Sequence, residues 1–159
     1  MIIDHDHVDW ERLYRHAYPS VYRALVATLL DADLAADALQ DAFVAGLDRP
    51  PPHDSNVAGW LFRVAMRKAG RARRRRMLTL QVGAVSPERD QIAALLDRLS
   101  VGQLLQLLTP RQRSIVVAYF YLDQTQEQIA ELLGIRRGTV AATISQALAR
   151  MRKGEVHVR

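Results

Sequence analysis

Hydrophobic residues recur along most of the chain every three or four positions, which is the period of an amphipathic helix. No stretch alternates apolar and polar residues with the period of a half-buried strand, and runs of β-branched residues are few. The pattern therefore predicts an all-α fold.

Helix start and stop residues divide this pattern into segments. Pro19 and Thr109-Pro110 favour the start of a helix, Thr125 and Gln128 have the spacing of a capping box, and Gly134 favours a helix end. Asp31 or Asp33, and Ser55 or Asn56, are candidate caps of two further helices. The expected helices cover residues 8–17, 19–30, 33–47, 57–77, 86–99, 110–121, 126–133 and 137–152, and continuation of the 86–99 helix to 108 is an alternative.

These segments predict two small helical domains. Residues 1–77 would form a four-helix unit, 78–85 a linker, and 86–159 a C-terminal unit of three or four helices that starts with Ser86-Pro87. Residues 48–56 contain three consecutive prolines, which fix the backbone and predict a stiff loop inside the first unit. A chain of 159 residues is long enough for two such units.

Composition excludes several classes of function. The chain has no cysteine, which excludes disulfides, thiolate zinc sites and cysteine nucleophiles and favours a cytoplasmic location. No apolar run approaches the ~20 residues that span a bilayer, and the acidic N-terminus does not resemble a secretory signal. Asp4, His5, Asp6 and His7 could bind a metal, but an acidic chain end is the simpler interpretation, and we expect no cofactor.

Charge is strongly segregated along the chain. Residues 1–60 carry ten acidic and four basic side chains, whereas residues 61–85 carry eight basic side chains and no acidic one. Such segregation predicts a nucleic-acid partner at one surface and a basic partner at another.

Residues 126–144 have the pattern of a helix-turn-helix. Ile129, Leu133, Ile135 and Val140 would form its apolar interior, Ala130 is small where two helices cross, and Gly134 permits the turn. An ordinary helical hairpin is the alternative, but the combined spacing favours a helix that enters the DNA major groove.

The end of the 57–77 helix is basic on all sides. This density suits phosphate neutralisation, which tolerates imprecise spacing. Trp60 and Phe62 could stack on unpaired bases, although core packing explains them better. The candidate DNA-binding side chains of this helix are Arg63, Arg67, Lys68, Arg71, Arg73, Arg74, Arg75 and Arg76.

The helix over 33–47 has an apolar stripe of Leu39, Phe43 and Leu47. Its other face carries a polar patch followed in line by an exposed apolar residue, which could dock a basic partner helix; a solvated acidic face is the simpler alternative. The candidate docking residues are Asp37, Gln40, Asp41 and Val44.

Together and in this order, these features resemble the sigma-70 family, and in particular its extracytoplasmic-function (group IV) sigma factors. The resemblance covers roughly residues 10–153. It is carried by 13–15 (LYR), 18–23 (YPSVYR), 36–43 (ADALQDAF), 60–65 (WLFRVA), 108–113 (LTPRQR), 129–135 (IAELLGI), 138–140 (GTV) and 147–152 (ALARMR).

The resemblance implies a transcription initiation factor that is not an enzyme. Its partners would be core RNA polymerase, through the clamp helices of the largest subunit and the flap region, promoter DNA and, in some members, an anti-sigma factor. The docking residues above would meet the clamp helices. The loop would hold a flipped base of the minus-ten element through Asp48, Arg49, His53, Asp54, Ser55 and Asn56.

In the same resemblance the helix from Trp60 onward meets the minus-ten element and the last helix reads the minus-thirty-five element. The residues expected to do so in the last helix are Arg136, Arg137, Thr139, Ala142, Thr143 and Gln146. The chain departs from the family where Met66-Arg67 replaces a usual Arg-Asn pair, and where Ala141 and Thr143 replace Lys and Arg. These departures predict altered promoter preference.

Two alternatives remain open at the level of sequence. The chain could be a sigma-derived DNA-binding regulator, or a protein-interaction module, that no longer directs polymerase. A nucleic-acid enzyme would need carboxylates or histidines near the basic surface, and residues 61–85 contain neither.

Overall fold

The computed structural model describes residues 9–52, 56–79 and 100–157, and in these ranges the chain is helical with no strand. The all-α prediction is therefore confirmed. The N-terminal unit consists of α1 (Trp10–Leu29), α2 (Ala32–Asp48) and α3 (Val57–Thr79). The C-terminal unit consists of α5 (Ser100–Gln106), α6 (Pro110–Val116), the π-helical η1 (Val117–Tyr121), α7 (Gln126–Leu133) and α8 (Arg137–His157). Leu78 and Thr79, the first residues of the expected linker, belong to α3. The rest of that linker and the Ser86-Pro87 helix start lie outside the described residues.

Side-chain caps determine where most of these helices begin. Asp9 and Asp31 accept the amides of Arg12 and Leu34, at the starts of α1 and α2. Thr109 starts α6 and Thr125 starts α7, and each forms the reciprocal capping box with the glutamine three residues later. Gly134 ends α7 in the left-handed conformation, with φ of 63°. The sequence predicted Thr109, Thr125 and Gly134, gave Asp31 as one of two candidate caps, and did not predict Asp9.

The expected helix break before Pro19 is wrong. Pro19 lies inside the continuous helix α1, so the described N-terminal unit has three helices and not four. A proline inside a helix removes the amide that would bond the carbonyl of Arg15, at a cost of about 3 kcal/mol. Burial of Val21, Leu25 and other residues of the next turns offsets that cost.

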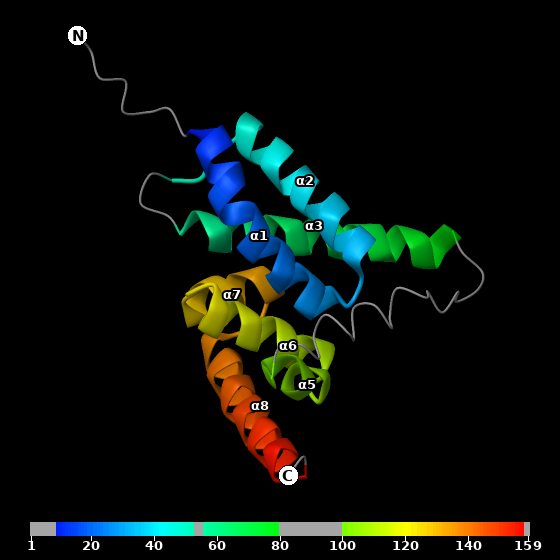
Figure 1. The fold of residues 1–159 in the computed structure, drawn as a ribbon, viewed down its shortest axis with the longest axis vertical. Helices are drawn as coiled ribbons and strands as arrows, with labels where there is room; N and C mark the ends of the chain where they lie inside the picture. The colour runs from blue at the N-terminus through cyan, green and yellow to red at the C-terminus, as the bar shows by residue number, and fades with distance from the viewer. Residues whose placement is uncertain (1–8, 53–55, 80–99, 158–159) are drawn as a thin grey trace.

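The core is continuous between the two units. In Figure 1, α1 crosses between α2 and α3 on one side and the C-terminal unit on the other, while α8 extends away from the body. The element pairs in contact include α1 with α6 and α1 with η1. A single cluster of buried side chains therefore includes residues of both units, which the sequence, read as two domains on a linker, did not predict.

Candidate nucleic-acid interface and docking face

The polar face of α2 is exposed as the sequence predicted. Asp37, Gln40 and Asp41 all face solvent, and Val44 follows them in line with 65% of its surface exposed. Leu39 and Phe43 on the opposite side are buried. The helix thus presents an acidic patch to solvent, with an apolar residue at one end of it.

The apolar margin of this patch is wider than expected. Leu47 was predicted to continue the buried stripe, but it is 64% exposed, whereas Gly46 of the same turn is buried against Trp10 of α1. Tyr14 of α1 is 47% exposed, and its ring lies 5.0 Å from that of Phe43. Tyr14 and Leu47 therefore extend the docking face, which we define as Asp37, Gln40, Asp41, Val44, Leu47 and Tyr14.

Tyr14 belongs to a ladder of tyrosines along α1. The rings of Tyr14 and Tyr18 are 4.9 Å apart, and those of Tyr18 and Tyr22 are stacked 5.9 Å apart. Burial raises the pKa of the Tyr18 hydroxyl, and the neighbouring Tyr14 and Tyr22 raise it further. The four-residue spacing of these tyrosines in the sequence could have indicated this surface before the structure did.

The basic end of α3 is the second candidate surface. Arg67, Arg71 and Arg73 to Arg76 are exposed, and Lys68 is half-buried. Basic side chains in the last turns stabilise α3, because the C-terminal end of a helix carries partial negative charge. Arg76 lies 3.8 Å from Asp31. The C-terminal end of α3 projects from the side of the molecule in Figure 1, and Arg74 and Arg75 in its last turns are exposed.

Two of the predicted DNA-binding arginines are engaged within the protein. Arg73 donates from Nη2 to the carbonyl oxygen of Leu29, at 2.6 Å, and so caps the C-terminal end of α1. Arg63 is half-buried, and its Nε has no hydrogen-bond partner. Burial lowers the pKa of Arg63, the nearby Glu131 of α7 opposes this, and Arg67 adds to it. In this arrangement Arg63 faces the C-terminal unit.

The proline-rich loop is described only at its two ends. Asp48 and Arg49 lie at the exposed end of α2, and Pro51 is buried. At the other end, Asn56 caps α3 by accepting the amide of Gly59, and its Nδ2 donates to the carbonyl oxygen of Leu122 in the C-terminal unit. His53, Asp54 and Ser55 lie outside the described residues.

The helix-turn-helix is formed by α7 and α8. Ile129 and Val140 are buried between these helices, as predicted, and the amide of Ile135 donates to the carbonyl oxygen of Ala130 to close the turn. On α8, Arg136 (just before its first turn), Thr139, Ala142 and Gln146 are exposed. Thr143 is half-buried and donates its hydroxyl to the carbonyl oxygen of Thr139.

Arg137, also predicted to contact DNA, is exposed and pairs with Glu127 of α7 at 2.8 Å. This ion pair ties the first turn of α8 to the first turn of α7. Both side chains line a shallow open groove together with Tyr119, Phe120 and Thr125. The ion pair therefore joins α7 and α8 at the protein surface, where both side chains stay largely exposed.

The described part of the chain gives little support for a metal site or a membrane-spanning helix. There, no group of three or more histidine, aspartate or glutamate side chains is placed to hold a metal ion. Residues 4–7 lie outside that part. Among the helices that the structure describes, none is long and apolar enough to cross a membrane.

Comparison with sequence families matches both units. Residues 13–79 match the family described as Sigma-70 region 2, and residues 98–151 match Sigma-70, region 4. Together these matches cover most of the chain.

Curated relatives match over similar ranges. The ECF RNA polymerase sigma factor SigM of Mycobacterium tuberculosis is 29% identical over 153 residues, which cover 92% of this chain and 76% of the relative. SigL of the same species is 27% identical over 150 residues, covering 88% and 85%. The RNA polymerase sigma-E factor of Streptomyces coelicolor is 38% identical over 68 residues, covering 43% and 38%.

Two solved structures share the fold. The sigma factor RpoE of Bartonella quintana, in complex with the anti-sigma factor NepR, superposes with a TM-score of 0.65 and 17% identity, covering 91% of this chain and 95% of that one. CnrH, in complex with the cytosolic domain of CnrY, gives a TM-score of 0.55 and 22% identity, covering 91% and 85%.

Proposed function

The chain belongs to the sigma-70 family, in its extracytoplasmic-function group, and on that premise we propose that it binds core RNA polymerase and directs recognition and melting of promoter DNA. The observation that carries the proposal is the separation of two surfaces within one N-terminal unit. An acidic, partly apolar face lies on α2, and a basic helix end lies on α3. Neither surface needs to perform covalent chemistry, which agrees with a role other than that of an enzyme.

The docking face suits a basic amphipathic helix of the polymerase. Asp37 and Asp41 supply charge, and Gln40 between them offers a hydrogen-bonding amide. Val44, Leu47 and Tyr14 supply exposed apolar surface beside that charge. Steering by charge, combined with a desolvated apolar centre, is typical of specific protein interfaces. We assign this face to the clamp helices of the largest subunit and the C-terminal unit to the flap region.

The basic surface suits the phosphates of DNA. Arg67, Arg71, Arg74 and Arg75 are exposed along the last turns of α3 and can neutralise phosphates without a defined spacing. Base recognition falls to the loop over 48–56, which would hold a base that has left the duplex. Binding of that base offsets the few kcal/mol that unstacking costs.

The second recognition surface is α8. Arg136, Arg137 and Thr139 lie at its start, where backbone amides also attract phosphate. Ala142, Thr143 and Gln146 follow on later turns and would face the base edges of the minus-thirty-five element. Short or partly buried side chains at 141 to 143 favour a base preference different from that of members with Lys and Arg there.

We further propose units over 1–77 and 86–159 with a linker over 78–85, a cytoplasmic location, and regulation by an anti-sigma factor. In two solved structures that share this fold, RpoE is in complex with the anti-sigma factor NepR, and CnrH is in complex with the cytosolic domain of CnrY. A partner of the NepR class would have to cover the docking face or the DNA surfaces of this chain.

A second candidate function is a sigma-derived regulator that binds DNA or another protein without polymerase. The observation that favours it is the set of α8 side chains, where Ala141 and Ala142 offer no hydrogen bond to a base.

Run-off transcription with purified core polymerase and a genomic promoter pool separates the two functions. Promoter-specific transcripts that require the chain are the result we expect. Holoenzyme that fails to assemble at physiological salt would overturn the sigma-factor proposal and leave the regulator. Core polymerase alone, and core polymerase with a charge-reversed Asp41→Lys chain, serve as controls.

A further inference from the structure

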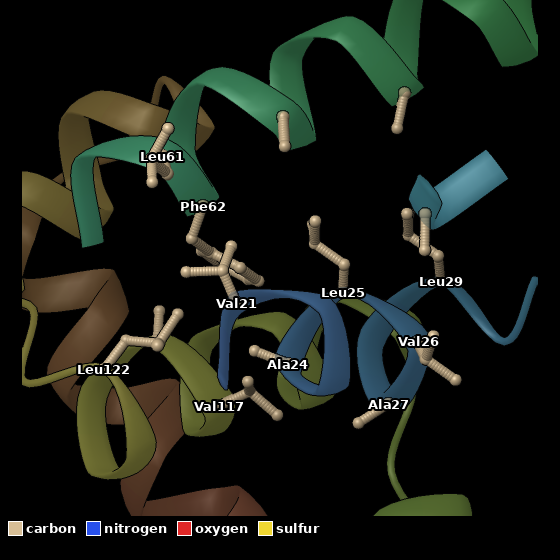
Figure 2. Packing of buried hydrophobic residues seen from close by; sticks show 14 of the residues in the cluster. Val21, Ala24, Leu25, Val26, Ala27, Leu29, Leu61, Phe62, Val117 and Leu122 are labelled. Carbon is tan, nitrogen blue, oxygen red and sulfur yellow. The ribbon is translucent and has the colours of Figure 1, made fainter. Parts of the chain in front are cut away.

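One side of α3 is committed to the N-terminal unit. Figure 2 shows Phe62 of α3 beside Val21 of α1, and both Phe62 and Ala69 are buried. Further along α3, Arg73 donates to a carbonyl oxygen of α1, and Arg76 lies 3.8 Å from an acid at the start of α2. At about 3.6 residues per turn, these four residues of α3 fall on the same side of the helix. That side is not available to a partner.

The opposite side of α3 is basic and has an exposed leucine within it. Its residues have the spacing i, i+3, i+4 and i+7, which places them on one side of a helix. All of them are exposed, and Leu78 is 87% exposed. A single exposed leucine is ordinary, so the weight lies on the pattern of charge around it. We define the outer face of α3 as Arg71, Arg74, Arg75 and Leu78.

The docking face on α2 repeats this spacing with the opposite charge. Its first four residues, Asp37, Gln40, Asp41 and Val44, also lie at i, i+3, i+4 and i+7, and all are exposed. Residues at equal spacing on two parallel helices meet in register, because the rise per residue is the same in both. The pairs that would then face each other are Asp37 with Arg71, Asp41 with Arg75, and Val44 with Leu78.

The two faces cannot meet within one chain. Arg76 lies beside Asp31, so the end of α3 is at the start of α2. Val44 follows Asp31 by 13 residues along α2, which is about 20 Å at a rise of about 1.5 Å per residue. Both faces belong to continuous helices, and neither can bend towards the other. A pairing of the two faces therefore needs two molecules.

Charge and apolar surface both favour such a pairing. Exposed ion pairs contribute little by themselves, but Val44 and Leu78 would bury apolar surface in the same contact. The chain carries a net charge of +5, so two copies repel each other at long range. At an ionic strength of about 0.1 M the Debye length is about 10 Å, which screens this repulsion more than it weakens groups in direct contact.

We propose that the outer face of α3 binds the docking face of a second copy of this chain, so that free copies associate head to tail. Two different faces form the contact, and each complex therefore keeps one unoccupied face of either kind. The self-association does not depend on the proposed function. One consequence does rest on it: each contact would cover the polymerase-binding face of one copy and phosphate-binding arginines of the other.

Sedimentation equilibrium of the full chain, without polymerase or DNA, tests the self-association. At about 0.1 M salt the average mass should rise above the 17.9 kDa of one chain as the concentration increases. At about 1 M salt the chain should stay monomeric, because the Debye length falls to about 3 Å. A chain that is monomeric at the lower salt up to its solubility limit would overturn the proposal.

A charge exchange between the two faces tests the pairing itself. Asp37→Arg/Asp41→Arg reverses the docking face, and Arg71→Asp/Arg75→Asp reverses the outer face of α3. Each variant alone should lose about tenfold or more of its self-association affinity, because like charges then face each other. An equimolar mixture of the two should associate again, since every reversed face finds an opposite one. A mixture that associates no better than either variant alone contradicts the pairing.

The matched control for the reversed α3 variant is Arg12→Asp/Arg23→Asp. It changes the net charge by the same amount at exposed positions of α1. This control should retain the self-association that Arg71→Asp/Arg75→Asp loses. Equal losses in the two variants would show that only the net charge matters and would overturn the proposal.

An uncharged substitution provides a second test if a charge-reversed variant does not fold. Leu78→Gln should weaken self-association about tenfold without a change of net charge, because it removes the apolar contact with Val44. Phe120→Gln is the matched control, at a residue of the C-terminal unit that is 54% exposed. Equal self-association of these two variants contradicts the proposal.

Run-off transcription with core polymerase separates this inference from the proposed function. A chain that self-associates but supports no promoter-specific transcript leaves the pairing in place and removes the sigma-factor role. A chain that is monomeric but directs transcription gives the opposite result.

Discussion

Arg113 of α6 donates to the carbonyl oxygen of Thr28 in α1, across the boundary between the two units. The same guanidinium also donates to the carbonyl oxygens of Leu105 and Leu108, at 3.0 and 3.1 Å. Burial lowers the pKa of Arg113, and the nearby Arg73 lowers it further. One buried arginine thus holds the loop before α6 and contacts the neighbouring unit.

Replacement of Arg113 should therefore destabilise the chain. In Arg113→Met the carbonyl oxygens of Thr28 and Leu108 lose the donor that Arg113 supplies, while that of Leu105 keeps the amide of Leu108, and the side-chain volume is largely retained. We expect a loss of about 2 to 3 kcal/mol in the free energy of unfolding, because buried acceptors are left unsatisfied. Urea unfolding followed by circular dichroism measures it. Arg111→Met, at an exposed position of the same helix, is the matched control and should change stability by less than about 0.5 kcal/mol.

The raised pKa of Tyr18 predicts that the free energy of unfolding falls at alkaline pH. Its pKa in the folded protein is raised above the ordinary 10.0, so the unfolded chain loses this proton first. As pH rises above 10 and through the folded pKa, the unfolded state therefore gains relative to the folded state. Thermal unfolding at a series of alkaline pH values should show that the melting temperature falls less with pH in Tyr18→Phe than in wild type. An identical decline in the two proteins would contradict the assignment, and Tyr121→Phe controls for the loss of a surface hydroxyl.

Charge reversal on the docking face should weaken polymerase binding without unfolding the chain. Asp41→Lys places a positive charge on an exposed position beside Val44, and we expect about a tenfold loss of affinity for core polymerase. Thermal stability should stay near the wild-type value because the residue is exposed. Glu11→Lys, another exposed acid of the same unit, is the control. Equal affinities of the two variants, measured by fluorescence anisotropy, would rule out this face.

The end of α3 should set the salt dependence of DNA binding. Arg74→Gln/Arg75→Gln leaves Arg73 on the carbonyl oxygen of Leu29 and removes two exposed charges. Each lost phosphate contact should reduce the slope of log affinity against log salt by about 0.7 to 0.9. Titration of holoenzyme on promoter DNA at several salt concentrations gives the slope. Arg12→Gln/Arg23→Gln removes the same charge from exposed positions of α1 and should leave the slope unchanged.

Some features of the two candidate surfaces could be predicted from the sequence, and others could not. The docking patch of Asp37, Gln40 and Asp41 followed from helical periodicity, since exposure on one face of a helix is a local property. The exposure of Leu47 did not follow, because it depends on which element covers the last turn of α2. Arg63 and Arg73 belong to a basic run in the sequence, yet contacts with α7 and α1 give them surroundings different from those of Arg74 and Arg75.

The sequence by itself determined the helical class, the helix starts at Thr109 and Thr125, the stop at Gly134, and the separation of acidic from basic segments, and it narrowed two further caps to Asp31 or Asp33 and Ser55 or Asn56. These features depend on hydrogen bonds and spacing within a few residues. Only the tertiary structure decided that α1 continues through Pro19 and that Gln124 packs on Gly59. Both depend on burial against segments distant in sequence, where the free energy of many contacts outweighs a local preference.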